Sequence, residues 1–208
     1  MHSDLNDESC FILPACKTRK MHSSRRDAFK PINSKEIAKV ELDGTVNFTN
    51  YHFNKKSNSK IKLKLFKENL KVGLIKVHPN MFAKEFEVYK SFNGLLIEGT
   101  GLGHAPINTI DKETKEHKNI LTTIQKLAKK IPVAMSTQTI SGRLNMNVYS
   151  TGRLLQEAGV IGNYSDMHPE TAYIKLAWLI SNHPKDVKKL FSENLRGEIT
   201  KRSLNEWS

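Results

Sequence analysis

The pattern of apolar and polar positions changes near residue 72. From there on, short apolar runs lie at 72–78, 94–98 and 132–135. Each run is short enough for a strand, and an almost continuous apolar character is typical of strands that are covered on both faces. The pattern therefore predicts three strands of a parallel sheet.

Segments with a helical period separate and follow these strands. Two of them, at 81–92 and 113–130, lie between the predicted strands. Two further helices are predicted to begin at Pro169 and Pro184, because proline fits the first helical position, where its missing N–H costs nothing. The second of these carries its apolar stripe as far as Leu195. This alternation predicts an α/β fold with helices on both sides of the sheet.

The first part of the chain has a different character. Residues 1–50 contain few sustained apolar runs, which is unusual for the beginning of a self-sufficient domain and suggests that a preceding part is missing. Residues 51–71 carry seven lysines and a single acid, a pattern typical of a solvated linker or exposed ribbon. We therefore predict three parts: a remnant at 1–50, a lysine-rich linker at 51–71 and a domain at 72–208.

Composition narrows the class of protein. Hydrophobic residues make up 38% and charged residues 26% of the chain, and no apolar run approaches the roughly 18 residues that a membrane helix needs. Neither a secretory nor a transit signal is visible at the start. Two cysteines, Cys10 and Cys16, have neither redox nor zinc spacing. We expect a soluble cytoplasmic protein without a metal site and without membrane contact.

The net charge of +12 raises the possibility of a nucleic-acid partner, since Lys and Arg facing phosphates supply non-specific affinity. The positive charge is spread over both halves of the chain rather than gathered in one segment. A lysine-rich solvated surface is therefore the favoured interpretation of the composition.

Two segments follow predicted strands, where open parallel sheets bind their ligands. They are Gly99–His104, which includes Gly101 and Gly103, and Ser136–Thr139. The glycines do not have the GxGxxG spacing of a dinucleotide site. They fit either a tight turn that needs positive φ or a turn that faces a ligand. His104 fits either a structural role or a binding role.

A basic segment near the start holds a third candidate. Arg19–Phe29 carries several cations, two serines and one acid. A solvated basic patch is the simplest interpretation. Lys20 could instead act as a base or proton relay, if burial or neighbouring cations lowered its pKa from the usual value of about 10.4.

Four blocks of sequence resemble, in order, a known family. They read MHSSRRDAFKPIN, GLLIEGTGLGH, STQTISGRLNMNVYSTGRLLQEAGVI and DMHPETAYIKLAW. Together they resemble the asparaginase/glutaminase family, and within it the D subunits of archaeal glutamyl-tRNA(Gln) amidotransferases. The resemblance covers nearly the entire chain and thins at 41–71. It implies an asparaginase-like α/β fold, with 1–50 as the tail end of the N-terminal domain and 72–208 as the C-terminal domain.

The resemblance also implies a chemistry. The family hydrolyses an amide side chain through a threonine nucleophile, assisted by a second threonine, an aspartate and a lysine. Lys20 matches this lysine. His104 lies at or near the position from which related asparaginases extend an amide side chain into a neighbouring subunit's pocket. The resemblance therefore implies a catalytic role for Lys20 and substrate binding by His104, Gly101 and Gly103.

Partners follow from the same resemblance. Glutamine would be the amide donor, and its ammonia would pass to a partner subunit that binds and phosphorylates Glu-tRNA(Gln) with ATP and Mg²⁺. This chain itself would bind no cofactor, would contact tRNA only indirectly and would form a homodimer within a larger complex. A free-standing L-asparaginase and a non-catalytic binding remnant are the alternative functions.

The chain departs from the family at the nucleophile. The family carries its threonines and aspartate in Gly-Gly-Thr-Ile and Gly-Thr-Asp-Thr segments, and neither occurs here. The Gly-Thr pairs at 44–45 and 99–100 do not match them. We therefore expect the chain to be inactive alone, as a fragment, as part of a split subunit or as an inactive remnant.

Overall fold

The computed structural model describes residues 1–51 and 53–203. It contains two compact units, which are described separately: the first comprises Met1–Leu63 and the segment from Asn194 onward, and the second comprises Lys64–Glu193. The predicted three-part division, with its linker at 51–71, stays a prediction.

The first unit consists of short antiparallel strands. A three-stranded sheet has the order β1-β4-β5, and a separate pair joins β2 and β3. The bounds are β1 Ser9–Ile12, β2 Thr18–Lys20, β3 Phe29–Pro31, β4 Ala38–Glu41 and β5 Val46–Phe48, with a 3-10 turn η1 at Ala15–Lys17. Strands of three or four residues leave too short an alternation to be recognised in the sequence, so none of them was predicted.

The second unit is built on a parallel sheet of order β6-β7-β8. The strands are β6 Val72–Lys76, β7 Gly94–Gly99 and β8 Val133–Thr137. Glu98 in the middle strand is aligned with Lys76 on one side and with Ser136 on the other. All three strands coincide with predicted apolar runs, which confirms the parallel sheet.

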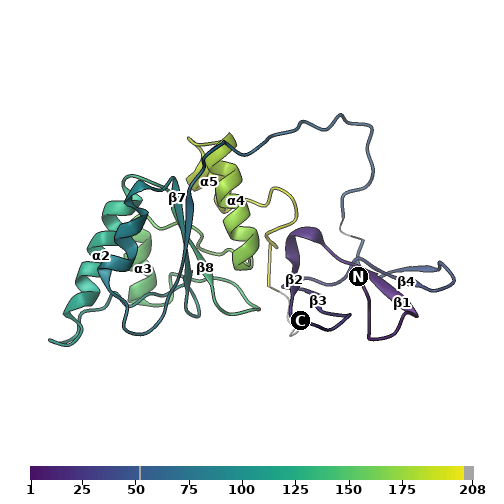
Figure 1. Ribbon diagram of the computed structural model, residues 1–208, viewed down its shortest axis with the longest axis horizontal. Helices are drawn as coiled ribbons and strands as arrows, with labels where there is room; N and C mark the ends of the chain where they lie inside the picture. Colours follow the sequence, from purple (N-terminus) through teal and green to yellow (C-terminus); the bar gives the residue numbers. More distant parts are fainter. Residues whose placement is uncertain (52, 204–208) are drawn as a thin grey trace. The chain divides into compact units, whose positions relative to one another are not determined.

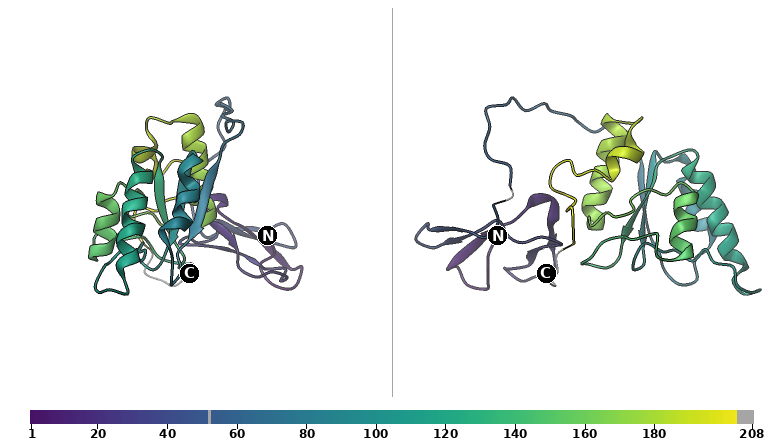
Figure 2. Two further views of the ribbon diagram at one scale, coloured as in Figure 1. Left: turned by 60° about the vertical axis from the view of Figure 1, so that its left-hand side comes forward. Right: turned by 180° about the vertical axis from the view of Figure 1, so that it is seen from behind.

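Helices cover both faces of this sheet, as the alternation predicted (Figures 1 and 2). Helices α2 and α3 lie on one side and α4 on the other. The bounds are α1 Ala83–Glu87, a 3-10 helix η2 Val88–Ser91, α2 Lys115–Ala128, α3 Ser150–Glu157, α4 Pro169–Asn182 and α5 Val187–Phe191.

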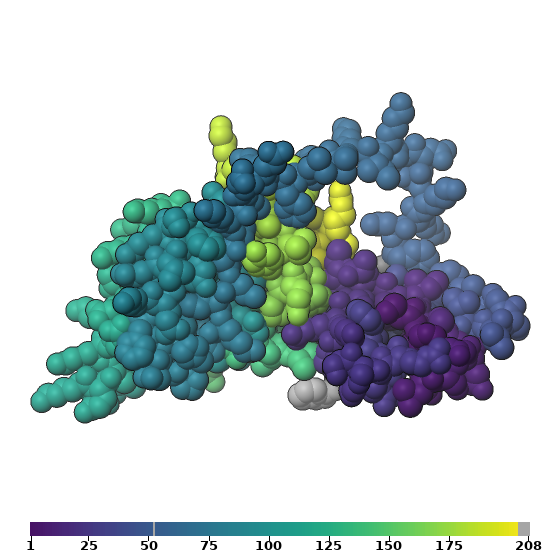
Figure 3. All heavy atoms as spheres, in the orientation of Figure 1, coloured from purple at the N-terminus to yellow at the C-terminus, as the bar shows by residue number. Residues whose placement is uncertain are grey.

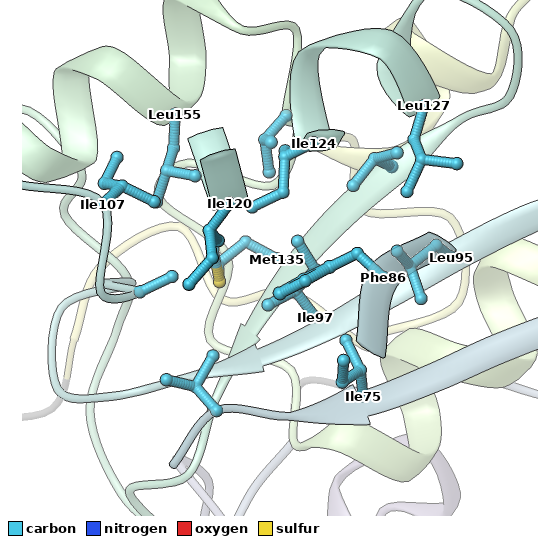
Figure 4. Close-up of a cluster of buried hydrophobic side chains, with 14 of the residues drawn as sticks. Ile75, Phe86, Leu95, Ile97, Ile107, Ile120, Ile124, Leu127, Met135 and Leu155 are labelled. Carbon is cyan, nitrogen blue, oxygen red and sulfur yellow. The ribbon is translucent and has the colours of Figure 1, made fainter. Parts of the chain in front are cut away.

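The core of the second unit lies between the sheet and α2. Ile120, Ile124 and Leu127 of α2 point toward Ile97 and Met135 on the strands (Figure 4). All five side chains are almost completely buried. Removing their apolar surface from water stabilises the fold by about 25 cal/mol per Å². Because this packing holds the strands against α2, it also fixes where the strands end.

One of the two helices predicted from a starting proline needs correction. Pro169 is the first residue of α4, as expected, and the His168 ring accepts a hydrogen bond from the Thr171 N–H there. Pro184 is not a helix start, because a turn precedes α5, which begins only at Val187. Leu195 lies beyond the end of α5, so the apolar spacing continued past the helix itself.

Strand β6 also differs from the expectation that both faces of each strand are covered. Leu74 is 47% exposed, and Lys76 on the same face is exposed as well. As an edge strand, β6 buries Ile75 in the core cluster on one face. Its remaining face extends the sheet surface beside α4.

The lysine-rich stretch forms no helix or strand over 54–67. It runs as a thin chain of blue atoms in Figure 3. Ile61 and Leu63 alternate with lysines and are 93% and 78% exposed. Among the described residues, no helix is both long and apolar enough to cross a membrane.

Candidate functional site

The carboxyl ends of the three parallel strands are joined by one side chain. The Gln138 Nε2 group donates to the carbonyl oxygen of Val77 at 2.5 Å and to that of Glu98 at 3.0 Å. The Gln138 backbone N–H donates to the Gly99 carbonyl at 2.8 Å. The loops after β6, β7 and β8 therefore leave the sheet from a fixed edge.

The loop Gly99–His104 is a tight turn that two backbone hydrogen bonds close. The Thr100 N–H donates to the His104 carbonyl, and the His104 N–H donates to the Thr100 carbonyl, both at 3.0 Å. Gly101 and Gly103 within the turn have φ of +49° and +104°. Positive φ is a conformation that glycine adopts without steric cost, so the turn itself accounts for both residues.

The two glycines differ in their surroundings. A Cβ on Gly103 would lie 2.9 Å from Leu144 Cδ2 and 3.0 Å from Met146 Cγ, whereas no heavy atom lies within 4 Å of a Cβ on Gly101. The Gly101 carbonyl accepts a hydrogen bond from Thr137 Oγ1 at 2.6 Å. Gly103 is therefore packed against the protein interior. Substrate binding by either glycine stays a prediction.

His104 projects from the end of this turn toward the start of α3. Its Nδ1 lies 2.7 Å from Thr151 Oγ1, and its ring packs edge-on against Tyr149 with the centroids 5.3 Å apart. Nε2 is buried and has no hydrogen-bond partner among the described residues. Burial lowers the pKa of His104 below the usual histidine value. A neutral imidazole with one unused polar atom results.

The second predicted segment, Ser136–Thr139, supports the turn. Thr137 Oγ1 lies 2.9 Å from Thr139 Oγ1 and donates to the glycine turn. Ser136 is 1% exposed, and its hydroxyl has no partner within the described part of the chain. Most of the polar groups here are thus committed to holding the loop.

Lys20 is the last residue of β2 and belongs to the first unit, whereas the other candidates lie in the second unit. Its side chain is exposed, and its ammonium lies 5.9 Å from the centroid of the Phe29 ring on β3. Within residues 1–51 and 53–203, no carboxylate or hydroxyl forms an ion pair or hydrogen bond with it. Its catalytic role stays a prediction, because the threonines and aspartate that it would assist do not occur in this chain.

The acid near Lys20 in the sequence has other partners. Asp27 is buried and accepts two hydrogen bonds from the Arg25 guanidinium, at 2.8 and 3.1 Å. Lys30 donates to the same carboxylate at 3.1 Å. Hydrogen bonds from Arg25 and Lys30 hold the pKa of Asp27 well below its usual range. This part of the basic segment is therefore an ion-pair cluster that fixes the β2-β3 turn.

Sequence reasoning missed Tyr149 and Thr151, because it assigned no helix at α3. The contact of Thr151 with His104 depends on Gly152, where a Cβ would lie 2.4 Å from the Met146 carbonyl oxygen, and no spacing in the sequence reveals this close approach. Only glycine lets the first turn of α3 approach the Met146 backbone this closely. That approach brings Thr151 to the imidazole of His104.

Comparison with known proteins identifies the family of the chain. The Glutaminase/Asparaginase C-terminal domain matches residues 71–191. The D subunit of the glutamyl-tRNA(Gln) amidotransferase from Methanobrevibacter smithii is 41% identical over 207 residues, with 98% of this chain and 45% of the relative covered. The corresponding protein of Pyrococcus furiosus is 40% identical over 205 residues, with 96% and 44% covered. The chain thus spans less than half the length of these relatives.

Solved structures give the same result. The thermostable L-asparaginase from Thermococcus kodakarensis superposes with a TM-score of 0.78 at 27% identity, covering 92% of this chain and 56% of that one. L-asparaginase I from Vibrio cholerae superposes with a TM-score of 0.74 at 26% identity, covering 90% and 55%. The α/β fold is therefore asparaginase-like, and the chain belongs to the glutaminase/asparaginase family.

Proposed function

We propose that this chain forms part of a glutaminase subunit that supplies ammonia for converting Glu-tRNA(Gln) to Gln-tRNA(Gln) in protein biosynthesis. The observation that carries the proposal is the identity of about 40% to amidotransferase D subunits over nearly the whole chain. The chain corresponds to the C-terminal portion of such a subunit.

The first unit supports a missing neighbour. Its buried apolar side chains are few, and those from its strands and turns are Ala28, Ile32 and Ala38. Larger apolar side chains are exposed there, including Leu42 at 81% and Phe48 at 43%. A unit with so few buried apolar side chains gains stability by packing against another part of the subunit. We assign this packing to the part that carries the family's Gly-Gly-Thr-Ile and Gly-Thr-Asp-Thr segments.

In the assembled enzyme, a threonine of that part attacks the carboxamide carbon of glutamine. Lys20 relays the proton between the threonine hydroxyl and the departing ammonia, a role for which a lysine close to an acid and a threonine is suited. His104 donates from its imidazole to an oxygen of the substrate. Water then releases glutamate from the acyl-threonine.

The ammonia is consumed by a partner subunit. That subunit binds Glu-tRNA(Gln) and uses ATP and Mg²⁺ to phosphorylate its glutamyl carboxylate. Ammonia then attacks the acyl phosphate, phosphate leaves and the carboxamide of Gln-tRNA(Gln) forms. This chain binds no cofactor and contacts tRNA only through the partner. The assembly contains two copies of the glutaminase subunit.

A fusion protein tests the proposal. The part of the Methanobrevibacter smithii relative that lies outside the match is fused ahead of Met1, and release of ammonia from glutamine is measured with and without the partner subunit and Glu-tRNA(Gln). We expect hydrolysis by the fusion, none by the chain alone, and formation of Gln-tRNA(Gln) only in the complete mixture. A fusion that folds but never forms Gln-tRNA(Gln) would refute the amidotransferase assignment.

The similarity to solved L-asparaginases favours a free-standing asparaginase as the second candidate. The same fusion distinguishes the two. Rapid ammonia release from asparagine in the absence of partner and tRNA would support the asparaginase and contradict the amidotransferase.

The exposure of Lys20 favours a third candidate, a non-catalytic binding module. In that case the fusion would release no ammonia from either amide, although it folded and bound the partner subunit. Binding without turnover in a co-purification assay would support this candidate.

A further inference from the structure

The contact between His104 and Thr151 carries an inference about a residue that has no assigned role. Thr151 is the second residue of α3, and its Oγ1 lies 2.7 Å from His104 Nδ1. The Tyr149 ring packs against the same imidazole from the residue just before α3. The start of one helix therefore fixes both the position and the rotation of the ring.

The direction of this hydrogen bond follows from counting donors. Among the described residues, Thr151 Oγ1 has His104 Nδ1 as its one hydrogen-bond partner, and Nε2 has none. If Nδ1 carried the proton, the Thr151 hydroxyl would lack an acceptor and Nε2 would lack a donor. If Thr151 donates to Nδ1, only the proton on Nε2 lacks a partner. The second arrangement leaves fewer polar groups unpaired, and unpaired buried groups are costly.

The surroundings also keep the ring neutral. The ring nitrogens lie beside the first turn of α3, whose positive dipole end disfavours an imidazolium. Burial acts in the same direction. No carboxylate forms an ion pair with His104 within the described part of the chain, so nothing there offsets these effects.

We propose that Thr151 is a positioning residue that donates to Nδ1 and thereby keeps the proton on Nε2 of His104. His104 then presents a neutral N–H to an oxygen of the amide substrate, and Thr151 acts on the reaction only through it. This assignment of the substrate rests on the function proposed above, whereas the Thr151–His104 pair does not.

The tautomer of His104 is measured directly in the full chain. Long-range ¹H–¹⁵N NMR spectra distinguish a protonated Nε2 from a protonated Nδ1, and a His104→Gln variant assigns the signals. We expect a protonated Nε2 in the unchanged chain and in Thr151→Ser, and a mixture of tautomers in Thr151→Val. The signals of His78, which contacts Glu85 and Pro79, serve as an internal reference.

A matched control separates this effect from a general loss of a threonine. Thr122 lies on α2, where its hydroxyl donates to the Lys118 carbonyl at 2.8 Å. Thr122→Val should leave the His104 signals unchanged. A protonated Nδ1 in the unchanged chain, or identical His104 signals in Thr151→Val, would overturn the proposal.

The substrate role is tested in the fusion with the missing part of the relative. Thr151→Val should raise the KM for glutamine roughly three- to tenfold with little change in kcat, as expected when one hydrogen bond loses its orientation. Thr151→Ser should restore the KM. An active fusion with an unchanged KM in Thr151→Val would overturn the role of Thr151. A fusion without any activity would count against the proposed function alone, because the NMR spectra decide the Thr151–His104 pair separately.

Discussion

Lys20 is the residue whose assignment depends most on what lies outside the chain. It is exposed at the end of β2, and its ammonium contacts only the Phe29 ring among the described residues. In the fusion enzyme, Lys20→Ala should lower kcat by about 10²–10⁴-fold, the range for loss of a proton-transfer group. Folding should change little, because the side chain is exposed and the contact that it makes is with the Phe29 ring.

Lys39 provides the control for this prediction. It lies in β4 of the same unit and forms an exposed ion pair with Glu41 at 3.1 Å. Lys39→Ala should therefore keep full activity in the ammonia-release assay. Equal rates for both variants would remove Lys20 from the mechanism.

His104 gives a second prediction at this scale. His104→Ala in the fusion should raise the KM for glutamine by an amount equivalent to about 1–3 kcal/mol, because a buried donor to the substrate is lost. Thermal unfolding should change little if the ring serves binding. A large fall in stability with an unchanged KM would restrict His104 to a structural role.

We expect the KM for glutamine to depend on the protonation of His104 only at acidic pH. Because burial lowers the His104 pKa below the usual value of about 6.5, the neutral imidazole predominates at pH 7 and above. Protonation therefore occurs only as the pH falls further, and there the KM should rise. Constant kinetics between pH 7 and 8 are expected under both the binding role and the structural role, so measurements below pH 6.5 are the informative ones.

The loop after β7 is the element on which the candidate site depends. Gly103→Ala should lower the free energy of unfolding by about 2–5 kcal/mol, since it combines a strained φ with a clash against Leu144. Gly101→Ala has open space around its Cβ and should cost only about 1–2 kcal/mol for the left-handed backbone. Urea unfolding of the two variants checks the order. Equal losses would contradict the packing role of Gly103.

Elements differed in how well the sequence revealed them. The strands β6, β7 and β8 and the helices α2 and α4 were predictable because their buried faces impose long apolar patterns. Helix α3 was not, since its eight residues contribute one buried leucine, Leu155. The Pro184 prediction was wrong because proline also fits the turn that precedes α5. In the site, resemblance pointed to His104, but the contact with Thr151 depends on a close approach at Gly152 that spacing does not reveal.

At the scale of the whole molecule, the two units differ in their cores. The second unit has a continuous cluster of buried apolar side chains, and its sheet is covered by helices on both faces. Residues 64–193 alone should therefore fold and unfold cooperatively. Residues 1–63 alone should remain largely unfolded, because their apolar side chains have too few neighbours to offset chain entropy.

Circular dichroism during urea titration measures the unfolding transition of each fragment, 64–193 and 1–63. The full chain provides the reference for the slope and midpoint of the transition. A gradual, non-cooperative transition of 64–193 would contradict the independence of its core. Cooperative unfolding of 1–63 would contradict the need for a neighbouring part, and with it one support for the proposed function.

Gln138, whose side chain joins the strand ends, makes the sheet edge sensitive to deamidation at one position. Both hydrogens of the Gln138 amide are donated to main-chain carbonyls, at Val77 and Glu98. Spontaneous deamidation would turn this donor into a carboxylate facing two carbonyl oxygens, so an attraction would become a repulsion. The fixed edge of the sheet in this glutaminase/asparaginase family member therefore depends on an intact Gln138 carboxamide.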